Sequence, residues 1–369
     1  MKALILSCGT GGGHNSAGAA VKEELLRRGH DVTMLSPYDL KGGRLSDCVD
    51  NTYISIAQRT PKLFGAIYAA GNWYRSLPWR SPVYFVNGRM AETMRAFLEE
   101  NAFDVVLMPH IFPAEILTYM RNHGMRIPKT VLIATDYSCI PFMEECVCDA
   151  YIIPSEKLKA DFVGRGIPAD RIYPFGIPVR SGFRQDMSRD EAKTQLGLDL
   201  QKRYILIAGG SMGAGKLEEV LQILHQLTSG TDLRPIAICG SNQILLRKLQ
   251  ARFGSQMEIL GRTDQIAVYL RASELYLTKP GGLSTTEAAV TGVPLGLLPP
   301  IPGCESINLR FFVENGMCRT VGPSVQSLNA ILDLIHCEDA CKEMVARQHQ
   351  VIPQDAAQQI CDLACRLAR

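Results

Sequence analysis

Short apolar runs alternate with segments of helical periodicity along almost the whole sequence. The apolar runs are rich in Val, Ile and Leu and have the length of strands that are buried on both faces of a sheet. They lie at residues 3–7, 31–35, 105–108, 130–134 and 150–153 in the first half, and at 204–208, 235–239, 257–260, 275–278 and 294–298 in the second. Strands that alternate with helices pair in parallel and are covered by helices on both sides. We therefore expect an α/β fold made of two similar halves.

A glycine- and proline-rich stretch at residues 175–182 separates the two halves. Glycine and proline interrupt regular structure, so this stretch suits a hinge between domains. With 369 residues, the chain is long enough for two domains of roughly 150–200 residues, each with its own core. We expect an N-terminal domain at residues 1–180, a C-terminal domain at 181–350, and a terminal helix at 351–369 that can pack back on the N-terminal domain.

Composition narrows the class of partner and the cellular compartment. The formal net charge of +2 favours neither nucleic acid nor membrane for the chain as a whole. No segment approaches about 18 uninterrupted apolar residues, and the first apolar run is too short for a signal peptide. The 12 cysteines are scattered, with no C-x-x-C pair and no common zinc spacing. We expect neither a disulfide framework nor a metal site, and a reducing cytoplasm as the context.

Residues 278–288 contain a turn that is typical of anion binding. Gly281 and Gly282 follow the strand expected at 275–278, and a segment with the features of a helix follows them. Backbone N–H groups and a helix N-terminus at the carboxyl edge of a sheet bind phosphate groups. Glu287 lies about one turn into that helix, where it can accept hydrogen bonds from a ribose. The segment predicts a nucleotide-sugar site, although an ordinary strand-to-helix turn can also contain a glycine pair.

A second glycine-rich loop, residues 8–14, follows the first expected strand. The dinucleotide fingerprint G-x-G-x-x-G would need glycine where His14 stands, and no clean acidic residue follows at about 20 residues. Both departures weigh against a nicotinamide cofactor. His14 is a titratable ring on a loop too rich in glycine for packing to explain it. We therefore take His14 as a candidate for catalysis and the adjacent Gly13 as a candidate donor contact.

Further loops after strands end in glycine or polar residues. Gly210 to Lys216 fits the spacing of a phosphate loop, but Leu217 replaces the Ser or Thr that would hold magnesium. A nucleoside triphosphatase is therefore not expected, and the loop better suits a phosphate or sugar wall that includes Ser211 and Met212. Each such loop is also consistent with a helix cap. The other candidates in loops after strands are Asp136, Gly240, Asn242, Gly261, Cys304, Glu305 and Asn308.

The segment at residues 59–95 departs from the alternation of strand and helix. It contains both tryptophans of the chain, several other aromatic residues, and six Arg or Lys residues against a single acid, Glu92. Basic and amphipathic aromatic side chains together suit a membrane surface at the level of the headgroups. A nucleic-acid groove uses the same residue types, and a helical subdomain with an aromatic core is the third interpretation. The candidate membrane or acceptor contacts are Trp73, Trp79, Arg75, Arg80 and Tyr84.

Taken together, the motifs resemble the diacylglycerol glycosyltransferases. These are the bacterial processive glucosyl-diacylglycerol synthases and the plant monogalactosyldiacylglycerol synthases, relatives of the enzyme that adds N-acetylglucosamine to lipid I. The resemblance covers nearly the whole chain, and the Lys-Pro-Gly-Gly-Leu block with its glutamate is its most specific part. Its carriers are residues 11–14, 135–137, 175–178, 239–242, 278–288, 302–303, Glu305 and Asn308.

The resemblance implies a GT-B-type architecture, in which two Rossmann-like domains face each other across a cleft. It also implies an inverting, metal-independent transfer of a hexose from UDP-glucose or UDP-galactose to the hydroxyl of diacylglycerol. His14 and Asp136 are the implied catalytic residues, and either could be the base. The implied donor-binding residues are Gly13, Gly210, Ser211, Met212, Gly240, Asn242, Gly261, Lys279, Gly281, Gly282, Leu283, Ser284, Thr285, Glu287, Cys304, Glu305 and Asn308.

Two departures from the family pattern leave the sugar and the acceptor open. Cys304 stands where the family usually has glutamine, and residues 137–142 lack a histidine and a tryptophan that many members have. We expect a peripheral protein on the inner face of the cell membrane, with a UDP-sugar, a lipid acceptor and an anionic membrane surface as partners, and no nucleic acid. The alternatives are a transferase with a polyprenyl or secondary-metabolite acceptor, a UDP-N-acetylglucosamine 2-epimerase, and a non-catalytic UDP-sugar sensor.

Overall fold

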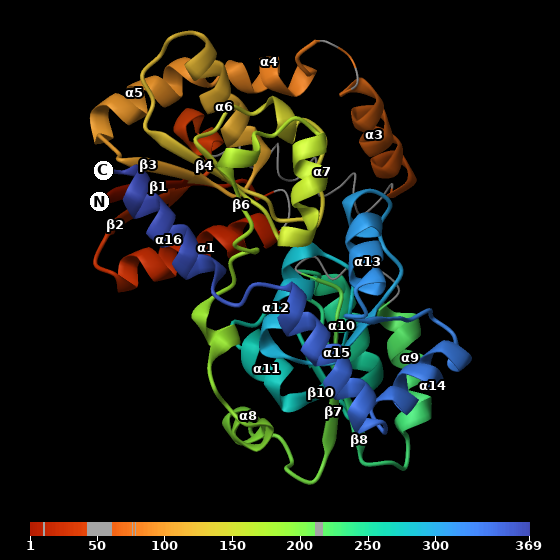
Figure 1. The fold of residues 1–369 in the computed structure, drawn as a ribbon. Helices are drawn as coiled ribbons and strands as arrows, with labels where there is room; N and C mark the ends of the chain where they lie inside the picture. Colours follow the sequence, from red (N-terminus) through yellow and green to blue (C-terminus); the bar gives the residue numbers. More distant parts are fainter. Residues whose placement is uncertain (10–11, 43–60, 76, 78, 211–216) are drawn as a thin grey trace. The chain divides into compact units, whose positions relative to one another are not determined.

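The computed structural model describes residues 1–9, 12–42, 61–75, 77, 79–210 and 217–369 (Figure 1). The chain forms two compact units. Unit 1 contains Met1–Ser181, Ile301–Ile307 and Asp355–Arg369, and unit 2 contains Gly182–Pro300 and Asn308–Gln354. Among the described residues, no helix is both long enough and apolar enough to cross a bilayer.

Unit 1 is built on a 6-stranded parallel sheet with the order β2-β1-β3-β4-β5-β6. The strands are β1 (Lys2–Leu6), β2 (Asp31–Leu35), β3 (Val105–Met108), β4 (Lys129–Ile133), β5 (Ala150–Ile152) and β6 (Ile172–Tyr173). Five of them lie where the apolar runs predict strands. The edge strand β6 was not predicted, because two residues carry no detectable periodicity.

Alternate residues of these strands pack into two separate cores, as a sheet covered on both faces requires. On one face, Ala3 and Ile5 of β1 join Val21 and Leu25 of α1 (Gly12–Arg27). On the other face, Leu4 joins the core formed with the helices α5 and α6. The remaining helical elements of unit 1 are η1 (Pro37–Lys41), α3 (Pro61–Tyr74), α4 (Pro82–Gly88), α5 (Ala91–Asn101), α6 (Ile111–Asn122), η2 (Met143–Glu145), η3 (Glu156–Leu158), α7 (Lys159–Gly164) and η4 (Ala169–Arg171).

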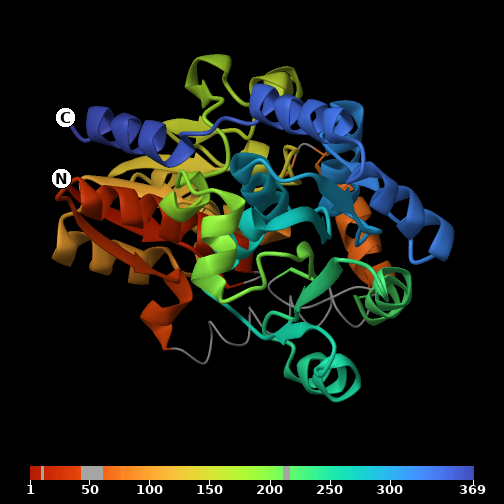
Figure 2. The same ribbon diagram turned by 90° about the horizontal axis from the view of Figure 1, so that it is seen from below.

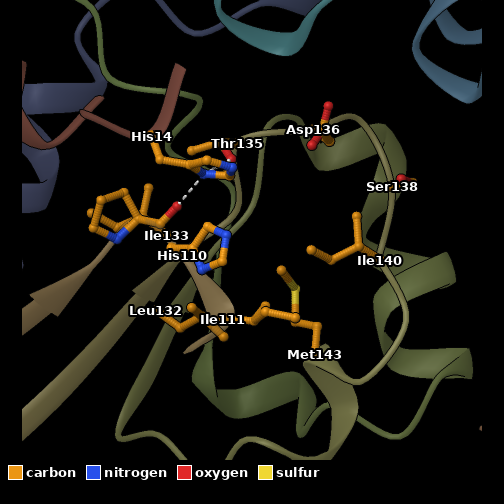
Figure 3. Close-up of a pocket in the computed structure, with 11 residues that line it drawn as sticks. His14, His110, Ile111, Leu132, Ile133, Thr135, Asp136, Ser138, Ile140 and Met143 are labelled. Atoms are coloured by element: carbon orange, nitrogen blue, oxygen red, sulfur yellow. Dashed lines mark hydrogen bonds between the residues drawn. The ribbon is translucent and has the colours of Figure 1, made fainter. Parts of the chain in front are cut away.

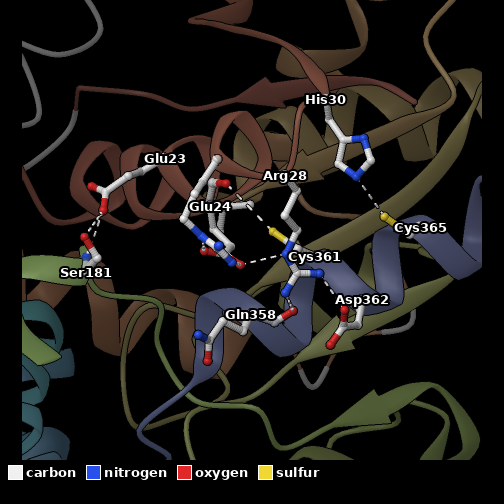
Figure 4. A network of polar contacts seen from close by, with 11 residues as sticks. Glu23, Glu24, Arg28, His30, Ser181, Gln358, Cys361, Asp362 and Cys365 are labelled. Carbon is white, nitrogen blue, oxygen red and sulfur yellow. Dashed lines mark hydrogen bonds and ion pairs between the residues drawn. The ribbon is translucent and has the colours of Figure 1, made fainter.

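The last helix of the chain, α16 (Ala356–Leu367), covers the same face of the unit 1 sheet as α1. Ile360 of this helix is fully buried in that core. The guanidinium of Arg28 donates to Glu24 over 2.6 Å and to Asp362 of α16 over 2.5 Å (Figure 4). Both views show the two ends of the chain close together (Figures 1 and 2). The terminal helix therefore completes unit 1, although it follows unit 2 in the sequence.

Unit 2 is built on a second 6-stranded parallel sheet, with the order β12-β11-β10-β7-β8-β9. Its strands are β7 (Arg203–Ala208), β8 (Leu233–Ile238), β9 (Glu258–Leu260), β10 (Ser273–Thr278), β11 (Leu295–Leu297) and β12 (Arg319–Thr320). The edge strand β12 was not predicted, for the same reason as β6. The remaining helical elements are η5 (Ser181–Arg184), α8 (Arg189–Leu196), α9 (Leu217–Thr228), α10 (Gln243–Phe253), α11 (Ile266–Ala272), α12 (Gly282–Thr291), α13 (Cys304–Glu314), α14 (Val325–Leu334) and α15 (Glu338–Val351).

Each sheet has one point at which the strand order reverses, and ligands of open α/β sheets bind at the carboxyl ends of the strands there. In unit 1 the order reverses between β1 and β3, and in unit 2 between β7 and β10. The loop before α1 follows β1, and the turn before α12 follows β10. The two glycine-rich loops that the sequence singles out therefore lie at the two reversal points.

Candidate functional site

His14 lies in the first turn of α1, just beyond the carboxyl end of β1. Its Nδ1 is 2.7 Å from the carbonyl oxygen of Pro109, at the end of β3, and 2.9 Å from Oγ1 of Thr135, after β4. A carbonyl oxygen can only accept, so the contact with Pro109 requires the proton on Nδ1. In this tautomer Nε2 keeps its lone pair. The loops after three neighbouring strands thus hold one imidazole in the form of a base.

Burial favours the neutral form of His14. It lowers the pKa of the ring from 6.5 to about 4, and the hydrogen bond to Pro109 offsets part of that effect. The imidazole is therefore neutral at physiological pH, and its Nε2 can accept a proton. A half-buried neutral histidine with a fixed tautomer can act as a general base toward a bound hydroxyl.

Asp136 lines the same pocket as His14 (Figure 3). It is half-buried and comes directly after Thr135. The two residues that were predicted as catalytic from opposite ends of the N-terminal half therefore share one pocket. The full lining is His14, Pro109, His110, Ile111, Leu132, Ile133, Thr135, Asp136, Ser138, Ile140 and Met143. Apart from the histidines, Asp136, Thr135 and Ser138, the side chains that line it are apolar.

His110 also lines this pocket, and the sequence analysis missed it. Its ring lies edge-on to the ring of His14, with 4.4 Å between the ring centroids. Its Nδ1 accepts a hydrogen bond of 3.1 Å from the backbone N–H of Phe112, so the side chain caps α6. The available signal was its position directly after β3, at the reversal point of the sheet.

In unit 2, the turn after β10 has the geometry of an anion site. Gly281 is the N-cap of α12 and Gly282 is its first residue. Apart from Gly281 itself, its chain neighbours and the backbone of α12, no atom of the described residues lies within 4 Å of the position that a Cβ on Gly281 would occupy. The free N–H groups at a helix start, together with the helix dipole, favour a phosphate at this position. Ser284 and Glu287, on the first turns of α12, are half-buried.

Two other predicted donor residues of unit 2 form hydrogen bonds to the backbone of the turn between β10 and α12. Asn308 is fully buried, and its Nδ2 donates to the carbonyl of Pro280 over 3.0 Å. Thr285 is also fully buried, and its hydroxyl donates to the carbonyl of Gly281 over 2.9 Å. Both side chains hold the turn between β10 and α12 in place, and their contact with the donor stays a prediction.

The remaining donor candidates fall into several groups. Lys279 and Leu283 are buried, and the Cε of Lys279 lies 3.4 Å from the position that a Cβ on Gly210 would occupy, so the lysine side chain lies against Gly210. Asn242 caps α10 through a 3.0 Å hydrogen bond from the backbone N–H of Leu245. Gly240 lies in the loop between β8 and α10 and has a φ of 58°, a backbone conformation that favours glycine. Gly261 follows β9, and Gly13 lies in the first turn of α1. Ser211 and Met212 lie outside the described residues.

Cys304 and Glu305 begin α13, in a stretch that groups with unit 1. Glu305 accepts a 2.8 Å hydrogen bond from the backbone N–H of Ile301. Burial raises the pKa of the Cys304 thiol well above its usual value, and the nearby Asp136 and Glu305 add to this shift. The thiol is therefore neutral at physiological pH and can serve as a weak hydrogen-bond donor.

The basic and aromatic segment forms an exposed apolar surface on α3 and α4. Trp73 and Trp79 are 66% and 68% exposed. We call the exposed apolar side chains of this region the aromatic surface; they are Leu63, Ile67, Trp73, Trp79, Phe85 and Val86. Residues 59–60, 76 and 78 of the predicted segment lie outside the described residues.

Three members of the predicted membrane set do not belong to this surface. Tyr84 is buried, and the Cζ of Arg80 lies 5.1 Å from the centroid of the Tyr84 ring. Arg80 also donates to the carbonyl of Glu145. Arg75 is largely buried and forms a 2.6 Å ion pair with Glu144. The prediction is corrected for these residues, because their polar groups are used within unit 1 and only the two tryptophans of the predicted set are well exposed.

The described residues also bear on metal and disulfide chemistry. Within the described part of the chain, no three His, Cys, Asp or Glu side chains are grouped as a metal site would require. Every cysteine that the structure describes is a free thiol.

Comparisons of sequence agree with the resemblance derived from the motifs. The family model for monogalactosyldiacylglycerol (MGDG) synthase matches residues 14–179. The processive diacylglycerol beta-glucosyltransferase of Bacillus subtilis (strain 168) is 25% identical over 350 residues, which cover 93% of this chain and 89% of that protein. The protein of the same name from Staphylococcus epidermidis (strain ATCC 12228) is 27% identical over 247 residues. These residues cover 66% of this chain and 62% of that protein. The predicted resemblance to the diacylglycerol glycosyltransferases is confirmed.

Comparisons of structure agree with the predicted fold. The crystal structure of Acinetobacter baumannii MurG is 17% identical, with a TM-score of 0.62 and 99% of each chain covered. A UDP-GlcNAc 2-epimerase from Neisseria meningitidis, bound to UDP-GlcNAc, is 14% identical with a TM-score of 0.62 and covers 99% of this chain and 100% of its own. The α/β fold of GT-B type is therefore confirmed.

Proposed function

We propose that this chain is a glycosyltransferase that moves a hexose from a UDP-sugar to the hydroxyl of diacylglycerol, with inversion and without a metal ion. The observation that carries the proposal is the neutral His14, held in one tautomer by Pro109 in an apolar pocket that also contains Asp136. The similarity to proteins named diacylglycerol glucosyltransferases supports the lipid acceptor. UDP-glucose and UDP-galactose are the donors we consider.

Unit 1 would supply the chemistry at the acceptor. The acceptor oxygen attacks the anomeric carbon of the hexose while its proton passes to Nε2 of His14, and the bond from that carbon to the UDP oxygen breaks. His14 then carries a positive charge in a largely apolar pocket. The carboxylate of Asp136 would stabilise that charge or orient the acceptor. The fixed tautomer of His14 supports the histidine as the base.

Unit 2 would hold the leaving UDP. The diphosphate gains negative charge as the bond breaks, and the amides at the start of α12 with the helix dipole would stabilise it without reorganising. The carboxylate of Glu287 would accept hydrogen bonds from the ribose hydroxyls. In this assignment unit 1 is the acceptor domain and unit 2 is the donor domain.

The aromatic surface would bring the enzyme to its lipid acceptor. Diacylglycerol stays in the bilayer, so a soluble unit must reach the headgroup level to meet it. Tryptophan and phenylalanine side chains partition to that level, and Trp73, Trp79 and Phe85 of the aromatic surface are exposed. We propose peripheral attachment to an anionic membrane, on the inner face of the cell membrane.

A panel assay tests the proposal. The protein is incubated with a set of UDP-sugars, with and without diacylglycerol vesicles, and both UDP release and glycolipid are measured by mass spectrometry. We expect UDP and a hexosylated lipid to appear together, and only when vesicles are present. Conversion of UDP-GlcNAc to its epimer would instead support an epimerase. Binding of UDP-sugar without turnover under all conditions would support a sensor and contradict the proposal.

A further inference from the structure

We propose that His110 is a positioning residue for His14: its ring holds the base in place and keeps water away from one face of it. The catalytic meaning of this proposal depends on the proposed function, since it takes His14 as the base. The geometric claim does not depend on that function, so the two can be tested separately.

The contact between the two rings comes from the topology of unit 1. His14 follows β1 and His110 follows β3, and these strands are neighbours at the reversal point of the sheet. The ring planes meet at 81°, with 4.4 Å between the centroids. On its other side His110 meets Phe112 in the same edge-on manner, at 4.4 Å and 69°. His14 therefore packs against His110, and His110 in turn contacts Phe112 (Figure 3 shows the two histidines).

The orientation of His110 is fixed by its role as a helix cap. Its Nδ1 accepts from the backbone N–H of Phe112, so the neutral ring carries its proton on Nε2. Capping alone does not explain a histidine here, because Asn, Asp, Ser and Thr are the preferred N-cap residues. The imidazole is larger than a cap needs, and it is this larger ring that contacts His14.

The same contact has an electrostatic consequence. Two imidazoles 4.4 Å apart disfavour each other's cationic form. Burial lowers the pKa of His110 well below its usual value, and the nearby His14 lowers it further. Asp136, which comes after β4, is the third titratable side chain among the residues that line this pocket. Tyr68 of α3 and Cys304 of α13 lie in turn close enough to Asp136 to interact with it.

Two substitutions separate packing from capping. His110→Asn keeps an oxygen that can accept from Phe112 but removes the ring next to His14. His110→Phe keeps a ring of similar breadth but removes the cap. A residue that only caps the helix should tolerate asparagine and not phenylalanine. If His110 positions His14, the pKa of His14 should be preserved in His110→Phe and changed in His110→Asn.

The primary measurement is the protonation state of His14 at pH 5, read from the side-chain ¹⁵N shifts of histidine-labelled protein and assigned with His14→Gln. We expect a neutral His14 in the parent chain and in His110→Phe. In His110→Asn, water should reach the ring and raise its pKa by about two units toward the ordinary value of about 6.5, so that the cation dominates at pH 5. A neutral His14 in His110→Asn would overturn the proposal, and that result stands even if His110→Phe fails to fold.

The second measurement is the pH dependence of glycosyl transfer. We expect the acidic limb of kcat to move to higher pH in His110→Asn, and kcat at pH 7 to fall roughly tenfold with little change in the KM for donor, since His14 would be held less firmly. An unchanged limb and kcat in His110→Asn would contradict a positioning role. If the parent chain transfers no sugar, the proposed function fails, while the ¹⁵N titration still decides the contact between the two rings.

Discussion

In the proposed mechanism, the chemistry of unit 1 depends on the imidazole of His14, whose tautomer and charge are both set by its neighbours. Pro109 requires the proton on Nδ1, and burial keeps the ring neutral. A histidine of this kind needs no carboxylate to fix its tautomer, because a backbone carbonyl does so. Asp136 is then available for the acceptor or for the charge that develops on His14.

Substitution of either residue should slow transfer without unfolding the protein. We expect His14→Ala and Asp136→Asn each to lower kcat by roughly 10²–10⁴-fold, the range for loss of general acid–base catalysis. Initial rates of UDP release with UDP-sugar and diacylglycerol vesicles give the measurement. Near-normal turnover in both variants would exclude this assignment. A weaker loss in Asp136→Asn than in His14→Ala would identify the histidine as the base.

Glu115 provides a second test at the level of single residues. It is fully buried on α6, and burial together with the nearby Glu145 raises its pKa from 4.5 to about 9. The folded protein therefore binds this proton more tightly than the unfolded chain does. The contribution of Glu115 to stability is present in full below about pH 4.5 and is lost progressively as the pH rises toward 9.

Glu115→Gln should abolish the loss of stability at high pH, because the glutamine side chain does not ionise. We expect a higher Tm for the variant at pH 8 by a few degrees, since 1 kcal/mol shifts Tm by about 2–4 °C in a domain of this size. The difference should vanish near pH 5. Melting curves at both pH values test this, with the exposed Glu100→Gln as the control. A difference in Tm that is the same at both pH values would contradict the assignment.

Sequence reasoning singled out His14 and Asp136 because unusual residue types follow strands there, and the structure places both in one pocket. It missed His110, since a lone histidine after a strand has no distinguishing pattern and its role follows from a neighbouring loop. It assigned Asn308 and Thr285 to the donor site but did not predict that both support the turn after β10. Their burial and their bonds to the turn after β10 depend on packing that no spacing rule contains.

At the level of elements, α3 and α4 separate residues that the sequence treats as one cluster. Composition predicted an interacting surface, but it could not tell which side chains face outward. Trp73 of α3 and Trp79, which lies between α3 and α4, are exposed, whereas Tyr84 of α4 is buried. Arg75 and Arg80 bond within unit 1. The attraction to a membrane should therefore depend more on aromatic partitioning than on these two cations.

Replacement of Trp73 and Trp79 by alanine should weaken vesicle binding. Burial of a large apolar side chain contributes about 1.5–3 kcal/mol, so we expect a loss of roughly tenfold or more in the partition coefficient. Co-sedimentation with vesicles that contain anionic lipid measures it. Ile244→Ala is the matched control, because Ile244 is 83% exposed and lies on α10 of unit 2. Unchanged binding of the double variant would contradict the membrane role of the aromatic surface.

The terminal helix α16 is an element whose importance is structural. Its buried face fills the core shared by β1 and α1. We expect Ile360→Ala to lower the free energy of unfolding of unit 1 by about 2–5 kcal/mol, the usual cost of such a cavity. Arg366→Ala, on the exposed side of the same helix, should change it little. Urea denaturation compares the two, and equal effects would show that the helix does not support unit 1.

At the level of the whole molecule, two sheets of different strand order each present a reversal point with a glycine-rich loop. The alternation of strand and helix predicted both parallel sheets, and only the edge strands β6 and β12 were too short to be found. One reversal point holds a base and the other a helix start suited to phosphate. A transferase needs both functions, and this division of roles is the central claim.

The most direct test follows a labelled sugar from donor to lipid. The protein is incubated with ¹³C-labelled UDP-glucose or UDP-galactose and diacylglycerol vesicles, and the lipid extract is analysed by mass spectrometry. The account predicts a diacylglycerol that has gained a labelled hexose, formed in equal amount with UDP and much reduced in His14→Ala. If the parent chain binds the nucleotide and no label enters the lipid, the central claim is wrong.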